Sequence, residues 1–526
     1  MPLRPLRRFV FVRVLQDVLF LGEAAWFAVL YVVPPVRHYN ITWIQNFDYG
    51  ILYNSSQMLA HFRAPFVTTR GTHSWADNQD YFQILLAPLH WLPAPHYWLL
   101  VSHSLAIFAC GVFCYFFLRR FGLVALLVPL VVWTSPHLAN MNIDLFHTEA
   151  FATILLLIMF YGALRGRVAL FWIGTLLALA CKEDVAITVG AFMFLAFFRP
   201  DLFRVGRRQL VAGFAAALGV FVLNQWVVLP HYKVATCQWL DADMASENMR
   251  SGPISPWFSD VWTQWLNPSW YRIKLGHPLV LHYLALLLWP LPFFVWHTFP
   301  IVLLPLAGAV INVIGSGYLI QTAYHYDHST YASIIIVMLL GLERMRWRTA
   351  VGLVLAGVAL WIDLRTTAVR MKLTAPKAAP DFWELAKDER TVFLERLSDV
   401  LPRDIVIAAD YTSINYLLPG RDAVYMLENP FRPDNFGIYG LCDGAVGKYR
   451  SVPTVDLAVV RSGFSMTPDV RQKIASGFDA YTVRLFGGRY PMALLINKQS
   501  PRYDELLAAA REMGAQPTGF AESFGG

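Results

Sequence analysis

The chain has 526 residues, of which 56% are hydrophobic and 15% are charged, and its mean hydropathy is +0.44. Soluble globular proteins carry about 25% charged residues, so this composition excludes an ordinary soluble domain. The net charge of +7 does not indicate a nucleic-acid partner, because the basic residues stand in short clusters at the ends of apolar runs. Windows of about 20 residues with almost no charge instead predict a multi-pass membrane protein.

The chain begins with the basic stretch "MPLRPLRRF" and continues into an apolar run that reaches Val33. This run is too long for the core of a signal peptide and no small-residue cleavage site follows it. We therefore expect an uncleaved first span with a cytoplasmic N-terminus. Similar runs recur and predict about eleven spans. They are 12–34, 97–118, 122–140, 149–164, 168–181, 185–199, 209–229, 279–297, 299–317, 330–343 and 349–365.

Basic clusters predict the orientation of these spans. They follow the second, fourth, sixth and tenth runs, which the positive-inside rule places on the cytoplasmic side. The clustered residues are Arg119, Arg120, Arg165, Arg167, Arg199, Arg204, Arg207, Arg208, Arg344, Arg346 and Arg348. The opposite side then receives the turn "NIDLFHTE", the turn "CKED" and the turn "QTAYHYDHS", together with the loops 35–96 and 230–278 and the whole C-terminal region.

Two parts of the chain outside the spans carry secondary-structure signals. In the first outer loop, 44–62 and 81–92 mix apolar and polar residues at helical spacing, which predicts amphipathic helices lying in the membrane interface. Short strands alternate with helices from residue 380 onward, which predicts a small α/β domain. Its expected strands are 404–410, 455–461 and 492–498, and its expected helices are 392–402 and 503–514. We therefore expect a transmembrane domain at 1–370 and a soluble extracytoplasmic domain at 380–526.

Ionisable residues gather on the outer side of the predicted spans. They are Asp48, Asp77, Asp80, Asp144, His147, Glu149, Lys182, Glu183, Asp184, His325, Asp327 and His328. A charged group at mid-bilayer costs about 2.5–3.5 kcal/mol on insertion scales, so such groups are usually functional or paired. Because five separate segments bring these groups to one face, we interpret them as the lining of a shared, water-accessible cavity.

Each of these residues also has a structural alternative. The turn "CKED" is also what an ordinary hydrophilic turn looks like, with Lys182 paired to a neighbouring acid. His147 fits a satisfied histidine at the interface, and Asp77 and Asp80 fit solvated acids of a polar loop. Asp48 lies in an otherwise neutral segment between Phe47 and Tyr49, although a lone Asp also serves as a helix cap.

Cofactor motifs are sparse. The spacings Asp144-x-x-His147 and His147-x-Glu149 match no established zinc site, which leaves a divalent metal ion as the minority alternative. No P-loop or Gly-rich dinucleotide motif is present, which argues against an ATP-driven pump. Cys237 and Cys442 would face an oxidising compartment, and a bond between them stays an open alternative.

Four motifs together resemble a known family. The segments "FDYG", "IDLFHTEAF", "CKEDVAI" and "YHYDHSTYASIII" occur in this order. They resemble a bacterial and archaeal family of polytopic membrane proteins known as domain of unknown function 2079, and the resemblance runs through residues 40–340. That family is similar in layout to the GT-C glycosyltransferases. The resemblance implies a bacterial inner membrane protein, a long first outer loop with juxtamembrane helices, and polyprenyl-phosphate-linked sugars as donors.

The same resemblance implies roles for the gathered residues. Asp48 corresponds to the catalytic carboxylate. Lys182, together with His325 or His328, would stabilise the departing phosphate. The remaining residues would position the acceptor, the donor or a divalent ion, and they are Asp77, Asp80, Asp144, His147, Glu149, Glu183 and Asp184. The first loop reads "WADNQDYF" where the family usually has an Asp-His pair.

A second class of function competes with the enzyme. A transporter or flippase, or a non-catalytic membrane protein that binds lipid or glycan, would also place polar groups in a cavity. Transporters commonly show internal repeats and sites near the membrane midplane. This chain shows no convincing repeat, and its ionisable residues lie at the ends of spans. We therefore favour the enzyme, whose partners would be a polyprenyl-phosphate-linked sugar and membrane lipid.

Overall fold

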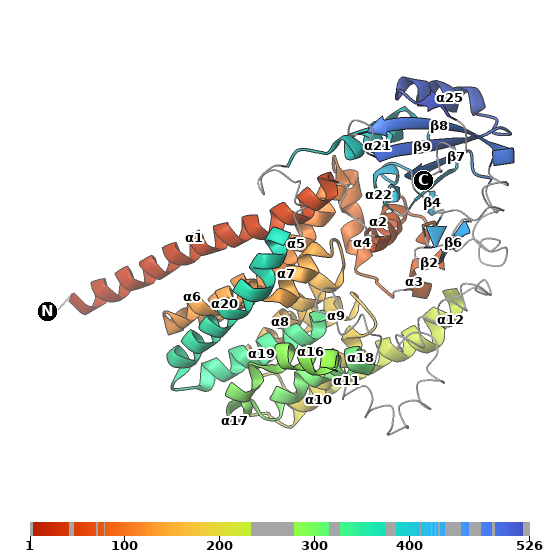
Figure 1. The fold of residues 1–526 in the computed structure, drawn as a ribbon. Helices are drawn as coiled ribbons and strands as arrows, with labels where there is room; N and C mark the ends of the chain where they lie inside the picture. Colours follow the sequence, from red (N-terminus) through yellow and green to blue (C-terminus); the bar gives the residue numbers. More distant parts are fainter. Residues whose placement is uncertain are drawn as a thin grey trace.

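The protein is described here by a computed structural model in which most residues are helical (Figure 1). The predicted class, a helical membrane bundle of GT-C-like layout with a small C-terminal α/β region, is confirmed. The structure describes residues 4–41, 47–69, 72–77, 79–232, 278–314, 327–373, 385–410, 412–421, 423–426, 428–429, 432–436, 454–461, 475–485 and 490–518.

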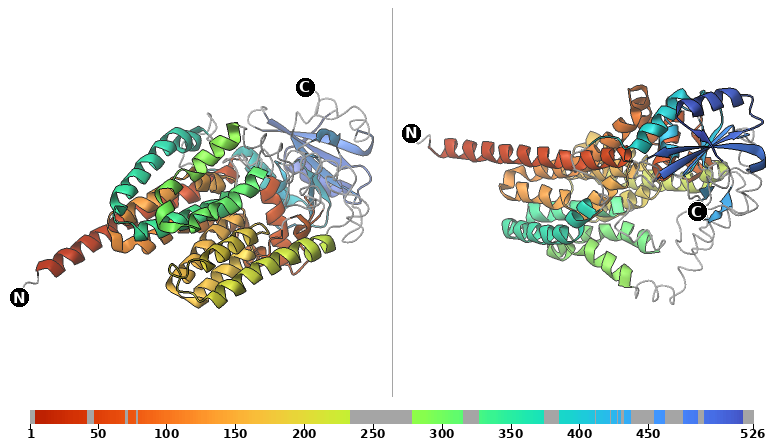
Figure 2. Two further views of the ribbon diagram at one scale, coloured as in Figure 1. Left: turned by 90° about the horizontal axis from the view of Figure 1, so that it is seen from below. Right: turned by 45° about the horizontal axis from the view of Figure 1, so that its top comes forward.

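The first helix, α1 (Arg4–Asn40), is the longest of the described helices. Its N-terminal part extends beyond the other helices, whereas the C-terminal sheet lies at the opposite end of the molecule (Figures 1 and 2). Val12, Val18 and Leu21 on this helix are each more than half exposed. Exposed apolar side chains are unfavourable in water but favourable in the hydrocarbon core of a bilayer, so this surface is typical of a membrane span.

The next helices in the chain pack beside α1. Helix α5 (Pro95–Leu118) packs against α1 and against α6 (Val124–Trp133). Helix α7 (Pro136–Ile143) follows α6 after a bend of 46°. The bend falls where Pro136 begins a new helix, because proline fits the first turn of a helix but disrupts the interior. Together α6 and α7 are long and apolar enough for one broken span or a re-entrant loop.

The remaining helices complete the bundle, and each of the eleven predicted apolar runs contains a helix. These helices are α8 (Glu149–Arg165), α9 (Val168–Leu179), α10 (Val185–Phe197), α11 (Arg207–Leu223), α12 (Leu229–Tyr232), α16 (Pro278–Leu288), α17 (Val295–Thr298), α18 (Leu304–Ile314), α19 (His328–Arg344) and α20 (Arg348–Leu373). Within the described ranges, three helices are individually long and apolar enough to cross a bilayer, and the α6–α7 pair makes a fourth. The count of about eleven spans stays a prediction.

The first outer loop is folded against the bundle. It contains the helices α2 (Phe47–Ala60), α3 (Ser74–Asp77) and α4 (Gln83–Leu86), and a short antiparallel pair formed by β1 (Phe66–Val67) and β2 (Thr72–His73). The polar side of α2 does not face solvent as an amphipathic helix would, and its position at the membrane interface stays a prediction. Asn54, Ser55, Ser56 and Gln57 are all buried, so the polar side of this helix is covered as well.

The C-terminal region is a mixed sheet with helices. The strand order is β10-β8-β9-β7-β3-β4, in which β3 runs parallel to β4 and β7 and the other pairs are antiparallel. A separate pair is formed by β5 and β6. The strands and helices are β3 (Ile407–Ala409), β4 (Val424–Met426), β5 (Glu428–Asn429), β6 (Arg432–Phe436), β7 (Leu457–Arg461), β8 (Phe478–Leu485), β9 (Tyr490–Asn497), β10 (Gln516–Pro517), α21 (Glu389–Val400), α22 (Ile414–Leu417) and α25 (Tyr503–Glu512).

This region covers α2 directly. The hydroxyl of Thr68 donates to the carbonyl of Val424 at 2.9 Å, and the hydroxyl of Tyr416 donates to the carbonyl of Tyr39 at 2.6 Å. Gly50 of α2 lies so close to α22 that an added Cβ would come within 2.6 Å of a side-chain oxygen of Asn415. These contacts explain why the polar side of α2 is buried.

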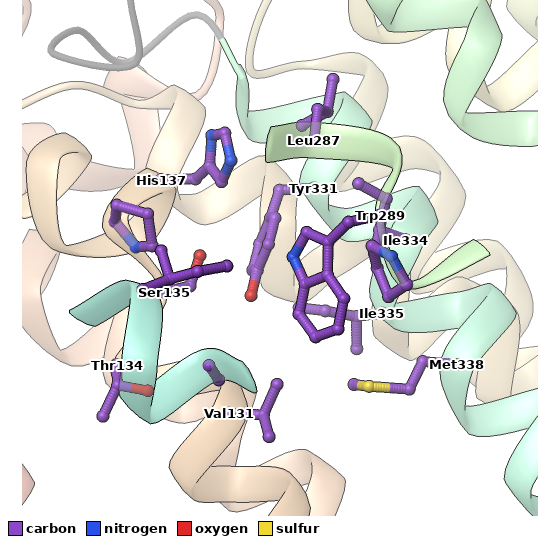
Figure 3. Close-up of a pocket in the computed structure, with 14 residues that line it drawn as sticks. Val131, Thr134, Ser135, His137, Leu287, Trp289, Tyr331, Ile334, Ile335 and Met338 are labelled. Carbon is purple, nitrogen blue, oxygen red and sulfur yellow. The ribbon is translucent and has the colours of Figure 1, made fainter. Parts of the chain in front are cut away.

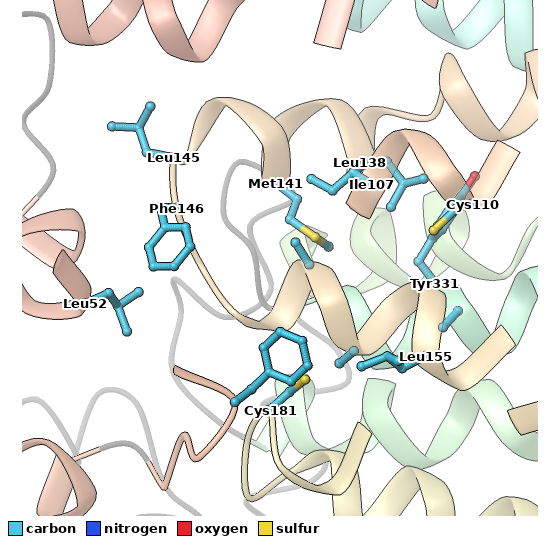
Figure 4. Packing of buried hydrophobic residues seen from close by; sticks show 14 of the residues in the cluster. Leu52, Ile107, Cys110, Leu138, Met141, Leu145, Phe146, Leu155, Cys181 and Tyr331 are labelled. Carbon is cyan, nitrogen blue, oxygen red and sulfur yellow. The ribbon is translucent and has the colours of Figure 1, made fainter. Parts of the chain in front are cut away.

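An apolar core lies beneath the outer turns of the bundle (Figure 4). It brings together Cys110 of α5, Met141 of α7 and Leu155 of α8 with Phe146 of the turn between α7 and α8. Leu52 of α2 belongs to the same cluster. Burial of such side chains contributes about 1.5–3 kcal/mol each, so the polar turns above them rest on a rigid apolar base.

Candidate functional site

The turn between α7 and α8 presents the first group of candidate residues. Leu145 in this turn has a φ of +61°, which is uncommon for a residue other than glycine. This conformation reverses the chain and buries both Leu145 and Phe146 in the apolar core. The neighbouring His147 is 3% exposed, so its imidazole also lies inside the protein. Strain of this kind persists only where the surroundings compensate it.

His103 of α5 holds this turn in place, a role that the sequence did not reveal. The backbone N–H of His147 donates to Nδ1 of His103 at 3.0 Å. Nε2 of the same ring lies 3.2 Å from the carbonyl of Met141, to which it donates. One histidine in an apolar run was the only available signal, and such a residue is ordinarily a satisfied core histidine. His103 is therefore a positioning residue for the turn.

A buried ion pair joins this turn to the turn between α9 and α10. Nζ of Lys182 lies 2.5 Å from Oε1 of Glu149, and the two side chains are 12% and 6% exposed. Glu149 is the first residue of α8, where the helix dipole favours a negative charge. The ring of His147 lies 3.9 Å from the other carboxylate oxygen of Glu149 and 3.8 Å from the carboxylate of Asp144.

A second pair brings the turn before α10 to the start of α19. Nε2 of His328 lies 3.4 Å from Oδ2 of Asp184, and the histidine is almost fully buried. Burial raises the pKa of Asp184, but the charges of His328 and Lys182 more than offset this effect and leave the pKa below its ordinary value. His328 takes part in this pair, whereas His325 lies outside the described residues, so the choice between the two histidines stays a prediction.

Asp80 of the first loop also reaches this site. The structural alternative of a solvated loop acid does not hold for Asp80, because this residue is 2% exposed. Its Oδ2 accepts hydrogen bonds from the hydroxyl of Thr148 at 2.5 Å and from the amide of Gln83 at 2.8 Å. Burial raises the pKa of Asp80 to about 8, and the nearby carboxylate of Glu149 acts in the same direction.

Glu183 is the second acid at the site with a raised pKa. Burial raises the pKa of this carboxyl to about 7, although the neighbouring ammonium of Lys182 opposes the shift. Glu183 and Asp80 therefore hold a proton over much of the neutral range. The negative charge that a bound anion meets is correspondingly smaller.

We use the name site network for the connected residues Asp80, Asp144, His147, Glu149, Lys182, Glu183, Asp184 and His328. They come from four segments, and the structure brings them together as one group of buried and half-buried side chains. Three candidates have side chains outside the described residues, although Asp48 itself lies in the first turn of α2 and Asp77 at the end of α3. The third is His325. Cys237, Cys442 and the loop from 233 to 277 also lie outside the described residues.

The chemistry of the network is that of charge pairs and proton carriers. Within the described part of the chain, no group of three His, Cys, Asp or Glu residues has the arrangement to hold a metal ion. Glu149 is already neutralised by Lys182, and Asp184 faces His328. Such a group binds an anion through its cations and exchanges protons through its buried acids.

Comparisons with solved structures identify the fold. The structure of ArnT from Cupriavidus metallidurans in the apo state matches with a TM-score of 0.51 and 13% sequence identity, and the match covers 91% of this chain and 97% of that chain. The structure of ArnT from the same organism bound to undecaprenyl phosphate gives a TM-score of 0.49 with the same identity and coverage. At this identity the likeness concerns the fold alone, and it agrees with the GT-C-like layout expected from the sequence.

Sequence comparison supplies the family. No curated protein matches the chain. A family model described as "Predicted membrane protein (DUF2079)" matches residues 39–411, which is well over half of the chain and includes the whole site network. The chain therefore belongs to this family of membrane proteins.

Proposed function

We propose that the protein is a membrane glycosyltransferase that transfers a sugar from a polyprenyl-phosphate donor to an acceptor on the extracytoplasmic face. The observation that carries the proposal is the buried pair of Lys182 and Glu149 at 2.5 Å, set in a network of proton-carrying acids within a GT-C-like bundle. The donor class is the one that the family resemblance implies.

The network suits the departure of a phosphate. As the bond between the sugar and the phosphate breaks, negative charge grows on the phosphate oxygens. Lys182 and His328 are oriented by their carboxylate partners before the reaction, so they stabilise this charge without large reorganisation. Because the pKa values of Asp80 and Glu183 are raised, these acids do not add two full negative charges beside the phosphate.

Asp48 is assigned as the general base. Its carboxylate takes the proton of the acceptor hydroxyl, the hydroxyl oxygen attacks the anomeric carbon, and the bond from that carbon to the phosphate oxygen breaks. The products are the glycosylated acceptor and free polyprenyl phosphate. The support for Asp48 is its place in the first turn of α2, where the resemblance puts the family's carboxylate.

The test is sugar transfer by the purified protein in lipid nanodiscs, with a panel of labelled polyprenyl-phosphate sugars, with and without a metal chelator. We expect transfer or hydrolysis that falls by at least about 100-fold in Asp48→Asn, the range that a general base contributes. The matched control is Asp201→Asn. Asp201 is an exposed acid paired with Arg199 on the basic side of the bundle, so full activity is expected.

Two results would overturn the proposal. One is full activity of Asp48→Asn in a folded protein, which would remove the assigned base. The other is solute uptake by proteoliposomes that depends on Lys182 and Glu149 while no sugar donor is consumed, which would establish the transporter instead.

A further inference from the structure

A second polar group lies beside the site network, on α7, α16, α18 and the start of α19. Nδ1 of His137 is 2.7 Å from Oδ2 of Asp327. The hydroxyl of Tyr283 donates to the other oxygen of Asp327 at 2.5 Å, and the amide of Asn312 donates to the same oxygen at 3.1 Å. All four side chains are buried. Asp327 is therefore fully engaged and fixes the orientation of the His137 ring.

The other ring nitrogen of His137, Nε2, is not engaged by Asp327. Nε2 is buried and has no hydrogen-bond partner among the described residues. A buried polar atom without a partner costs about 1–3 kcal/mol, so a fixed ring with such an atom is typical of a binding site. Because Nδ1 faces the carboxylate of Asp327, Nε2 is the ring nitrogen that remains for a ligand.

His137 stands at one end of a narrow pocket, which we call the His137 pocket (Figure 3). Ser135 lies between His137 and Thr134 in this view. The rest of the lining is apolar or aromatic, and it includes Val131, Leu287, Trp289, Tyr331, Ile335 and Met338. In Figure 3, His137 and Leu287 lie at one end of the group and Val131 and Met338 at the other. The pocket therefore has His137 at one end and mostly apolar or aromatic side chains along the rest of its lining.

The polar end of the His137 pocket is close to the site network. Tyr331 lies one turn after His328 on α19, and residues three apart on a helix share a face. The ring of Tyr331 stacks on that of His137 with a centroid distance of 5.3 Å. One helical turn advances about 5 Å along the axis. The pocket thus begins about one turn away from the histidine that contacts Asp184.

The apolar end reaches the middle of the bundle. Ala359 lines the pocket and is eleven residues into α20, which places it about 16 Å along that helix. This is about half of a hydrocarbon core of about 30 Å. Next to it, Leu360 and Trp361 are 54% and 58% exposed, so the surface beside the pocket is apolar and suited to lipid. The pocket therefore runs from the site network towards the membrane midplane.

We propose that the His137 pocket binds the first isoprene units of the polyprenyl phosphate, with Nε2 of His137 hydrogen-bonded to the phosphate group. This inference rests on the proposed function and assigns its lipid subsite. The lining has His137 at one end and apolar or aromatic side chains along the rest, which matches a phosphorylated prenol, in which a phosphate is followed by a hydrocarbon chain. The chain enters beside α20, and the phosphate remains between His137 and the cations of the site network.

The test is binding of polyprenyl phosphate without sugar to the whole protein in nanodiscs. We expect Ala359→Trp, which fills the pocket, to weaken binding by at least about tenfold, or about 1.4 kcal/mol. The matched control is Leu360→Trp, the adjacent residue on the same helix, whose side chain points to lipid and whose substitution should leave the affinity unchanged. His137→Gln should weaken polyprenyl phosphate but not the corresponding dephosphorylated prenol. Inorganic phosphate and a straight-chain alkyl phosphate complete the panel.

A photoreactive polyprenyl phosphate with its diazirine in the first isoprene units provides an independent measurement on the unmodified protein. We expect labelled peptides from α16, α19 and α20. Labelling confined to other helices, or equal affinity of Ala359→Trp and the native protein, would overturn the subsite. Equal competition by inorganic phosphate alone would also overturn it. Binding at this pocket without transfer of any sugar would instead refute the proposed function and leave the subsite standing.

Discussion

Glu149 and Lys182 have both lost most of their contact with water, and each compensates the charge of the other. Removing one partner of a buried pair leaves an uncompensated charge, which costs about 3–5 kcal/mol. We therefore expect Lys182→Met to lower the free energy of unfolding by about that amount. The double variant Lys182→Met with Glu149→Gln should recover much of the stability but no activity.

The measurements are thermal unfolding in detergent and sugar transfer by the same preparations. Recovery of both stability and activity in the double variant would show that the pair is structural only. A single variant as stable as the native protein would show that water reaches Glu149 and that the pair is not buried in solution.

Asp80 gives a prediction for pH. Its pKa is raised from 3.8 to about 8 by burial, so the folded state binds the proton more tightly than the unfolded chain. Its contribution to stability is present in full below pH 3.8 and is lost as the pH rises through about 8. Asp80→Asn keeps a neutral acceptor for Thr148, so its melting temperature should fall less between pH 5 and pH 8 than that of the native protein.

Thermal unfolding across this pH range measures the effect, and Asp504→Asn on an exposed acid of α25 is the control with an unchanged slope. The prediction fails if Asp80→Asn and the native protein have parallel profiles. Among single residues, the sequence predicted Glu149, Lys182 and Asp184 as candidate site residues, because charges at the ends of apolar runs are costly. It did not mark the burial of Asp80, because burial depends on a packing partner elsewhere in the chain.

At the scale of elements, α8 and α9 pack through two glycines. A Cβ on Gly162 would lie 2.3 Å from the backbone nitrogen of Phe171, and a Cβ on Gly174 would lie 2.4 Å from that of Met159. Small residues let helix backbones approach closely in membranes. We expect Gly162→Val or Gly174→Val to separate the two helices, to move the turn that carries Lys182 and to abolish stable folding.

The matched control is Gly219→Val on α11, where an added Cβ meets nothing within 4 Å. Detergent-stable, monodisperse protein should be obtained for this control and for neither of the other two variants, as judged by size-exclusion chromatography. Native yield and melting temperature for Gly162→Val would contradict the close packing of α8 on α9.

Local sequence patterns predict the helices of the bundle but not the contacts between distant elements. The helices of the bundle follow the apolar runs because a lipid-buried backbone must satisfy its own hydrogen bonds, and a helix does so within each run. The sequence also predicted that α2 is a helix, but it did not predict that the C-terminal region packs against this helix. Thr68 and Gly50 contact residues more than 350 positions later in the chain, and no local pattern records such a partner.

For the whole molecule, the site network and the C-terminal sheet lie towards the same end, whereas the basic clusters lie at the ends of helices that point the other way. We expect cysteines placed at His61 and Glu505 to react with an impermeant thiol reagent from outside cells, and a cysteine at Arg208 to react only after lysis. Cys237 and Cys442 are replaced by Ser beforehand. Labelling of positions 61 and 208 from one side would refute the orientation.

By itself, the sequence determined that the protein is a membrane bundle and where its helices run, because hydrophobicity and helix length act locally, and its charge bias predicts which side carries the ionisable turns. It also determined the order of the four motifs that mark the family. Only the tertiary structure decided that Lys182 pairs with Glu149, that His328 contacts Asp184 and that His103 and His137 are held by distant partners. These choices depend on which turns meet at the end of the bundle, and that meeting is set by helix packing, which brings together residues far apart in the chain.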